Sequence, residues 1–210
     1  MKIQKIDMTT YSRKAHFDYF CSMGYPYVGL TANVDITDIV KCSKERNESF
    51  FLYILYSVGN AANSVREFRQ RIEGKEIIEY ENCMTSHTVM KPDGTYAYCE
   101  ADSTLNFEEF LRVTAKNQEK VVIKGSLEEE SDPRSLIFIS CLPWVSYTSL
   151  VQPVPFPADS NPRITWGKYF PEGEKLLLPV SVLAHHALID GKQIADFYES
   201  LSLHLRRLAR

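Results

Sequence analysis

The sequence predicts an α/β (α+β) two-layer sandwich, a mixed β-sheet with helices packed on it. Strand-like and helix-like patterns alternate along the chain, as they do in mixed folds. Residues 175–184 are almost continuously apolar, which is typical of a strand whose two faces are both covered. Residues 49–64 are apolar almost all round, which indicates a buried helix.

Length and composition favour one globular domain over residues 1–210. Hydrophobic residues make up 44% of the chain and charged residues 24%. The net charge is -3 and no basic stripe is visible, so we expect no nucleic-acid partner. The apolar runs are too short to span a bilayer, and residues 1–7 are polar, unlike a secretory signal. We therefore expect no membrane association.

The five cysteines are scattered, and none stands in a C-x-x-C pair. Their odd number and wide spacing argue against a disulfide framework and against a zinc site. Each is expected to be a small apolar filler in a reducing compartment. This predicts a cytoplasmic protein with no metal. The cysteines are Cys21, Cys42, Cys83, Cys99 and Cys141.

The first elements are a short helix and a strand. Residues 12–23 predict a helix with Ser12 as its N-cap and with Phe17 and Phe20 on its apolar face. Apolar residues alternate over residues 28–34, which predicts a half-buried strand.

Two helices and two strands follow. Residues 37–44 and 49–64 predict helices, and Ser49 is the expected N-cap of the second. Residues 77–80 and 85–90 predict strands.

A turn and a capped helix come next. The sequence Lys-Pro-Asp-Gly at residues 91–94 predicts a turn, after which residues 95–99 return as the partner strand. Residues 106–120 predict a helix that Asn106 caps, with acidic residues in the first turn that suit the helix dipole.

The C-terminal third contains three more strands and the last helix. Residues 135–142 predict a strand, and residues 163–170 and 175–184 predict two strands joined by a hairpin turn at 171–174. Asp190 and the glycine after it then begin a helix over about residues 192–208.

A motif follows the buried strand directly. Residues 185–191 read H-H-x-x-x-D-G, which resembles the catalytic motif of CoA-dependent acyltransferases of the chloramphenicol acetyltransferase type. Dihydrolipoamide acyltransferase cores and peptide-synthetase condensation domains share this motif, so other blocks must decide between them.

Four more blocks resemble the chloramphenicol acetyltransferase family, in order and at family-like spacing. Residues 12–17 resemble its S-R-K-E-H-F opening, and residues 138–149 resemble its S-x-x-P-W-V-x-F-x-S block. Residues 164–169 resemble T-M-G-K-Y, and residues 177–182 resemble L-L-P-L-x-V. The resemblance extends from residue 12 to the last helix and implies the CoA-dependent acyltransferase fold.

The resemblance implies roles for four residues. His186 corresponds to the family's general base, a task that suits imidazole because its ordinary pKa lies near neutrality. Ser140 corresponds to the serine whose hydroxyl donates to the tetrahedral oxyanion. Asp190 is either an N-cap of the last helix or the partner of Arg13, and the two roles are compatible. Without the resemblance, His186 would be interpreted as a core histidine with its hydrogen bonds satisfied, and Ser140 as an ordinary strand serine bonded to backbone.

The resemblance also implies where acetyl-CoA, the co-substrate, binds. Trp144, Thr165, Lys168 and Tyr169 correspond to positions near CoA or its tunnel. An aromatic ring could cover pantetheine or adenine, and an ammonium could meet a phosphate. From the residues alone, the aromatic side chains are core and the lysine is a solvated strand residue.

The implied activity is acetyl transfer to a hydroxyl of a small molecule, chloramphenicol or another, in a ternary complex. The resemblance further implies a homotrimer with active sites at subunit interfaces. The chain departs from the family around His87, which is either an acceptor-pocket residue or a plain strand histidine. Two alternatives stay open: a dihydrolipoamide acyltransferase-like core and a non-catalytic binding or scaffold protein.

Overall fold

The computed structural model describes residues 2–210, and their main sheet has seven strands. The strand order is β2-β10-β8-β7-β5-β6, and the short β9 pairs with β10. The strands are β2 (Tyr27–Asp35), β5 (Met84–Met90), β6 (Tyr96–Ala101), β7 (Leu136–Leu142), β8 (Arg163–Gly167), β9 (Phe170–Glu172) and β10 (Lys175–His185).

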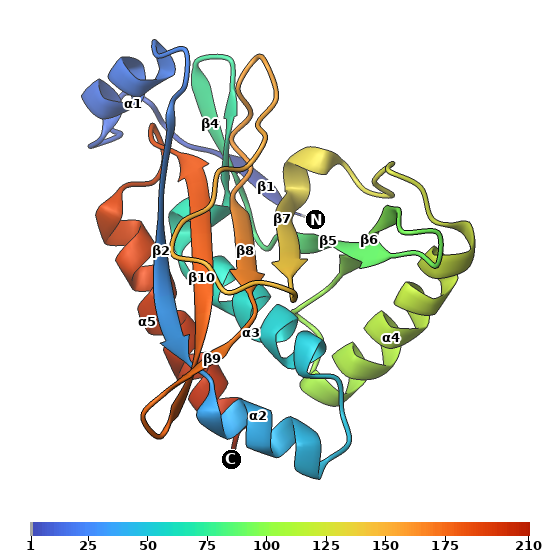
Figure 1. Cartoon of the computed structure of the whole chain (residues 1–210). Coiled ribbons are helices and arrows are strands. Elements are labelled where there is room, and N and C mark those ends of the chain that lie inside the picture. The colour runs from blue at the N-terminus through green and yellow to red at the C-terminus, as the bar shows by residue number, and fades with distance from the viewer. Residues whose placement is uncertain (1) are drawn as a thin grey trace.

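The sheet is mixed, as the sequence predicts. β7 runs parallel to β5 and to β8, whereas β10 is antiparallel to β2, β8 and β9, and β6 is antiparallel to β5. The long β10 therefore runs in the opposite direction to β7, so the C-terminal ends of the two strands lie at opposite ends of the sheet. Figure 1 shows the two arrows pointing in opposite directions.

Five α-helices accompany the sheet. In Figure 1, α3 and α5 lie behind the strands and α4 lies beside β6, while the loop between β7 and β8 crosses in front. The helices are α1 (Lys14–Cys21), α2 (Thr37–Glu45), α3 (Phe50–Ser64), α4 (Phe107–Lys124) and α5 (Gly191–Leu208), with short 3-10 turns η1 (Arg66–Arg69) and η2 (Pro133–Ser135).

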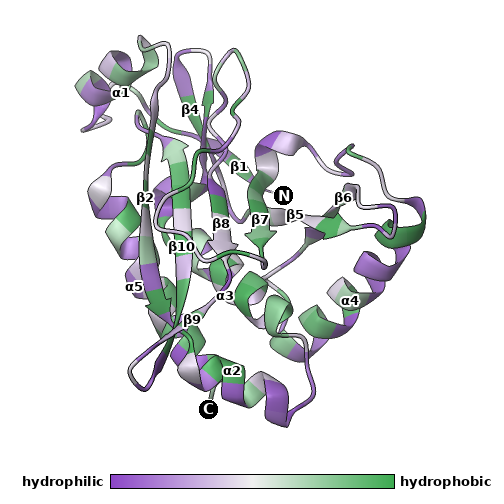
Figure 2. Cartoon of the chain, viewed as in Figure 1, coloured by the Kyte–Doolittle hydropathy of each residue, from purple (hydrophilic) through white to green (hydrophobic). Residues whose placement is uncertain are grey.

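The core lies between the sheet and the helices behind it. α3 contributes nine buried residues and packs against α5. The ring of Phe197 on α5 stacks on Phe68 of η1, with centroids 5.4 Å apart. Figure 2 shows α3 as largely hydrophobic, whereas α2 and α4 alternate between hydrophilic and hydrophobic residues. This confirms that residues 49–64 form a buried helix.

Two predicted helix caps are present. The Asn106 side chain accepts a hydrogen bond from the Glu109 amide at 3.0 Å, and α4 continues four residues past its predicted end to Lys124. The Asp190 side chain accepts from the Lys192 amide at 2.9 Å and begins α5.

The other two predicted caps differ in outcome: the prediction for Ser12 is wrong, and that for Ser49 is right in position only. α1 begins at Lys14 with Arg13 in the N-cap position, so Ser12 lies one residue too early to cap it. Ser49 does occupy the N-cap position of α3, but its side chain makes no capping hydrogen bond.

The prediction that every cysteine is a small apolar filler is wrong for Cys21, which is exposed, whereas Cys42, Cys83 and Cys99 are buried.

The strand predicted over residues 163–170 is interrupted. β8 stops at Gly167 because the next amide, that of Lys168, donates to the carbonyl of Val145 in the preceding loop and not to a neighbouring strand. The Tyr147 ring lies so close to Gly167 that an added Cβ there would stand 2.8 Å from it. The chain then resumes at Phe170 as β9.

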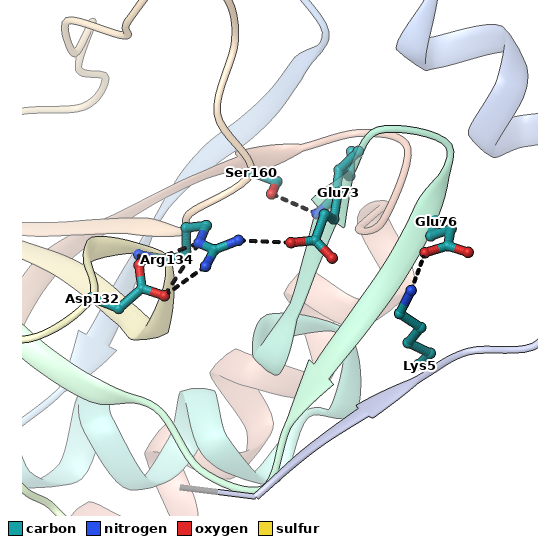
Figure 3. A network of polar contacts seen from close by, with 7 residues as sticks. Lys5, Glu73, Glu76, Asp132, Arg134 and Ser160 are labelled. Carbon is teal, nitrogen blue, oxygen red and sulfur yellow. Dashed lines mark hydrogen bonds and ion pairs between the residues drawn. The ribbon is translucent and has the colours of Figure 1, made fainter.

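A second sheet, in the order β1-β4-β3, was not predicted beyond its central strand. It comprises β1 (Ile3–Lys5), β3 (Gln70–Glu73) and β4 (Glu76–Tyr80). Figure 3 shows how polar contacts tie it to the main body: Arg134 bonds Glu73 at 2.8 Å, and the Ser160 hydroxyl accepts from the Ile72 amide. Within residues 2–210, no helix is long and apolar enough to cross a membrane.

Candidate active site

His186 lies directly after β10, where its backbone amide donates to the Pro26 carbonyl at 2.7 Å. Its Nδ1 lies 3.0 Å from the Ile189 carbonyl oxygen. A carbonyl can only accept, so Nδ1 must carry the proton, and Nε2 is left with a free lone pair. The Phe20 ring stacks on the imidazole with centroids 3.8 Å apart and fixes its plane. This tautomer can accept a proton at Nε2.

Asp190 holds the segment after His186 in two ways, and both predicted interpretations of it are present together. One carboxylate oxygen caps α5, and the other lies 2.5 Å from Nη1 of Arg13. The Gln193 side-chain oxygen accepts a hydrogen bond from the Asp190 amide at 3.0 Å, which completes a capping box. Burial alone would raise the pKa of the Asp190 carboxyl, but hydrogen bonds from Arg13 and the Lys192 amide outweigh it and lower the pKa.

His185 does not share the site of its neighbour. It is buried beside Tyr27, with ring centroids 5.8 Å apart, and its Nδ1 accepts from the Ala187 amide. Burial lowers the pKa of His185 to about 4. Its ring is therefore neutral at physiological pH and accepts a hydrogen bond from the backbone of the turn that follows β10.

Ser140 lies in a row of hydroxyl residues that crosses the sheet. It pairs with Thr165 on β8, which pairs with Ser181 on β10, which in turn pairs with Thr31 on β2. Thr31 and Ser181 hydroxyls are 2.6 Å apart, and Ser181 also donates to the Tyr147 hydroxyl at 3.3 Å. Thr165 is buried within this row.

Two cavities meet at Ser140. One, of about 700 Å³ and mostly apolar, is called here the Trp144 cavity. Trp144 is 67% exposed at its rim, which is unusual for so large an apolar side chain. The charged and aromatic residues that the resemblance implies for CoA line the same cavity, and Phe50 and Phe51 of α3 line it too. Among these residues are Trp144, Lys168 and Tyr169.

The other cavity, of about 500 Å³, is called here the Ser140 cavity. It has a mixed character, with apolar walls and several polar side chains. Residues lining it include Ser86, Glu129, Phe138, Leu150, Arg163 and Thr165.

The structure separates the predicted site residues into two groups. His186, Asp190 and Arg13 lie together, and Ser140, Thr165, Trp144, Lys168 and Tyr169 lie together. Ser140 is level with Ser181, two strands away, and β10 continues four more residues to His185. At about 3.3 Å per residue and about 4.8 Å per strand, this puts the backbone of His185, the residue before His186, on the order of 16 Å from that of Ser140. Within one chain, the sheet therefore separates the backbone of His186 from that of Ser140.

His87 lies in β5 with its ring turned away from both cavities. It is 1% exposed, its Nε2 lies 2.9 Å from the Gln118 amide nitrogen, and burial lowers its pKa to about 3. The interpretation as a strand histidine is therefore confirmed.

Phe20 and the Ile189 carbonyl were missed as partners of His186. A backbone carbonyl leaves no trace in a sequence, but Phe20 was visible as an apolar position of the predicted first helix.

Comparison with known proteins gives a consistent result. The family model described as chloramphenicol acetyltransferase matches residues 1–202. Chloramphenicol acetyltransferase 2 of Escherichia coli is 30% identical over 211 residues, which cover 97% of this chain and 97% of that protein. A solved chloramphenicol acetyltransferase structure superposes with a TM-score of 0.82 at 25% identity, over 97% of this chain and 100% of that one.

Dihydrolipoamide acetyltransferases share the fold alone. The protein from Azotobacter vinelandii matches with a TM-score of 0.69 at 17% identity, over 92% of this chain and 88% of that one. This confirms the predicted fold class.

Proposed function

The chain belongs to the chloramphenicol acetyltransferase family, and from that membership we propose that it transfers an acetyl group from acetyl-CoA to a hydroxyl of a small molecule. The relatives it matches are named for chloramphenicol, which is therefore the first acceptor to test, with antibiotic inactivation as the outcome. The observation that carries the proposal is the free Nε2 of His186, held by Ile189 and Phe20.

His186 is the general base of the proposed reaction. As the acceptor oxygen bonds to the thioester carbonyl carbon, its proton passes to Nε2, and the carbonyl oxygen becomes negative. The carbon–sulfur bond then breaks, and the departing thiolate takes the proton back from His186. Imidazole is neutral before and after the reaction, and the products are the acetyl ester and CoA.

Ser140 is the donor that stabilises the negative oxygen. Ser140 lines both cavities, which supports this role. The thioester carbonyl must lie where acetyl-CoA meets the hydroxyl compound, and a hydrogen-bond donor at that point faces the developing oxyanion. We propose that the acceptor occupies the Ser140 cavity and that the two substrates form a ternary complex there.

Acetyl-CoA fits the Trp144 cavity chemically. Its apolar wall suits the pantetheine arm, and the exposed Trp144 and the half-buried Tyr169 offer rings for stacking. Lys168 is exposed at the rim and could hold a phosphate as a point charge. Thr165 supports the site from β8.

The active site forms between subunits in this proposal. The end of β10, which His186 follows, is on the order of 16 Å from Ser140 of the same chain. A second copy that brings its own His186 to the Ser140 cavity removes this gap. A homotrimer of cyclic symmetry supplies every such cavity with one histidine, because each subunit gives to one neighbour and receives from the other.

Two further parts of the proposal concern the chain as a whole. Residues 1–210 form one domain, a view supported by the pairing of β2 near the start of the chain with β10 near its end. The protein is cytoplasmic, a view supported by five cysteines that all remain free thiols.

The direct test measures thiol release from acetyl-CoA in the presence of chloramphenicol. We expect release that requires both chloramphenicol and His186, so that His186→Ala, with an unchanged circular dichroism spectrum, is inactive. A fully active His186→Ala protein would remove the base from the mechanism. Release with a different hydroxyl compound, but not with chloramphenicol, would keep the mechanism and replace the acceptor.

A further inference from the structure

The Ser140 cavity contains one carboxyl group that has no cationic partner. Glu129 lies in the loop between α4 and η2, and its Oε1 accepts from the Ser86 hydroxyl at 2.8 Å. Its Oε2 is buried and has no hydrogen-bond partner among residues 2–210. Burial raises the pKa of this carboxyl. A buried acceptor left without a donor destabilises the site until a ligand supplies one.

The cation of the same cavity is already neutralised. Arg163 donates through Nη1 and Nη2 to the two carboxylate oxygens of Asp159, each at 2.8 Å. The Tyr27 hydroxyl donates to Asp159 as well, at 2.9 Å. Arg163 therefore has little left to offer an anionic ligand, and Glu129 is left as the uncompensated charge of the cavity.

The rest of the cavity selects the remainder of the ligand. Phe138, Ile139, Leu142, Leu150 and Val151 provide apolar surface beside Ser140. This surface suits an aromatic or hydrocarbon body whose polar end faces Glu129. Glu128 and Glu130 flank Glu129 in sequence but do not line this cavity, so the effect belongs to one side chain and not to the acidity of the loop.

We propose, on the basis of the proposed function, that Glu129 selects an acceptor that carries a protonated amine beside the hydroxyl to be acetylated, on an apolar body. An ammonium supplies the missing donor and the missing charge together, and charge-assisted hydrogen bonds are about twice as strong as neutral ones. A protonated amine has no lone pair, so it does not compete with the hydroxyl for the acetyl group.

A matched pair of acceptors tests this. Chloramphenicol carries a neutral amide, and its free-amine form keeps the nitrophenyl ring and both hydroxyls but carries an ammonium. The ratio of kcat/KM for the amine to kcat/KM for the amide is measured in the unaltered protein and in Glu129→Gln. Glutamine keeps the shape and an acceptor for Ser86 but loses the charge. We expect the ratio to favour the amine and to fall roughly ten- to a hundredfold in Glu129→Gln.

Glu130→Gln is the control, because it removes the same charge from the next residue of the same loop. The ratio should not change in this variant. A ratio that is equal in the unaltered protein and in Glu129→Gln would overturn the inference while leaving acetyl transfer intact.

Binding separates this inference from the proposed function. Calorimetry measures the affinity of the free amine for His186→Ala protein, which binds without turnover. In the double variant that also carries Glu129→Gln, binding should be weaker by roughly tenfold or more. If neither compound is acetylated but this weakening is seen, the acceptor assignment fails and the role of Glu129 stands. Binding that Glu129→Gln does not weaken overturns the role of Glu129.

Discussion

Asp190 should contribute to stability through two separable contacts, and substitution can measure each. Asp190→Ala removes the N-cap of α5 and the ion pair with Arg13, whereas Asp190→Asn keeps a capping oxygen and loses only the charge. Loss of a cap costs about 1 kcal/mol. Loss of a charge-assisted hydrogen bond costs about 1.5 kcal/mol, the lower end of its range, because the two side chains are 20% and 35% exposed.

These figures predict a loss in the free energy of unfolding of about 2.5 kcal/mol for Asp190→Ala and about 1.5 kcal/mol for Asp190→Asn. At about 2–4 °C per kcal/mol for a chain of this size, Tm should fall by roughly 5–10 °C and 3–6 °C. Thermal unfolding followed by circular dichroism at one protein concentration measures both. Arg13→Ala should match Asp190→Asn. Equal losses for Asp190→Asn and Asp190→Ala would refute the capping contribution.

The remaining predictions concern other parts of the molecule. Ser140→Ala should lower kcat about a hundredfold or more with an unchanged fold, measured by thiol release. Trp144→Ala should raise KM for acetyl-CoA, whereas an unchanged KM would exclude Trp144 from the donor site. Asn106→Ala should cost about 1 kcal/mol in denaturant unfolding, because α4 loses its cap. Stability should fall as pH falls from about 6.5 towards 4, because His87 and His185 have lowered pKa values and the unfolded chain binds protons first. His87→Gln should reduce this slope, and an unchanged slope would contradict the burial of a neutral ring.

Much of the fold could be predicted because its signals are local. The α4 helix begins at a capping asparagine, and β10 is marked by a continuous apolar run. Both roles of Asp190 were predictable. The N-cap depends only on the helix that Asp190 begins, and the ion pair with Arg13 was implied by the family pattern.

The misses share a physical cause, namely contacts between distant segments. β8 stops at Gly167 because Tyr147 and Val145 contact it there, and both belong to a loop some twenty residues earlier in the sequence. α1 starts at Lys14 with Arg13 at its N-cap and bonded to Asp190 at the other end of the chain. Neither contact leaves a pattern in the local sequence.

The residues of the candidate site were predictable, and the family resemblance also implied active sites at subunit interfaces, but the physical reason for dividing the site was not visible in the sequence. The motif blocks identified His186 and Ser140 together, and nothing in their spacing showed that the sheet keeps them apart. That separation follows from strand register, which only the folded sheet fixes.

In the proposed trimer, each active site takes His186 from one subunit and Ser140 from another. Mixing two inactive variants tests this. His186→Ala and Ser140→Ala proteins, each inactive or nearly so alone, are refolded together in equal amounts so that their subunits exchange. Some interfaces then combine an intact His186 with an intact Ser140, about a quarter of them for random assembly of a cyclic oligomer. We predict thiol release well above that of either parent. If the mixed oligomers form and release no more thiol than their parents, the two residues do not act across a subunit interface.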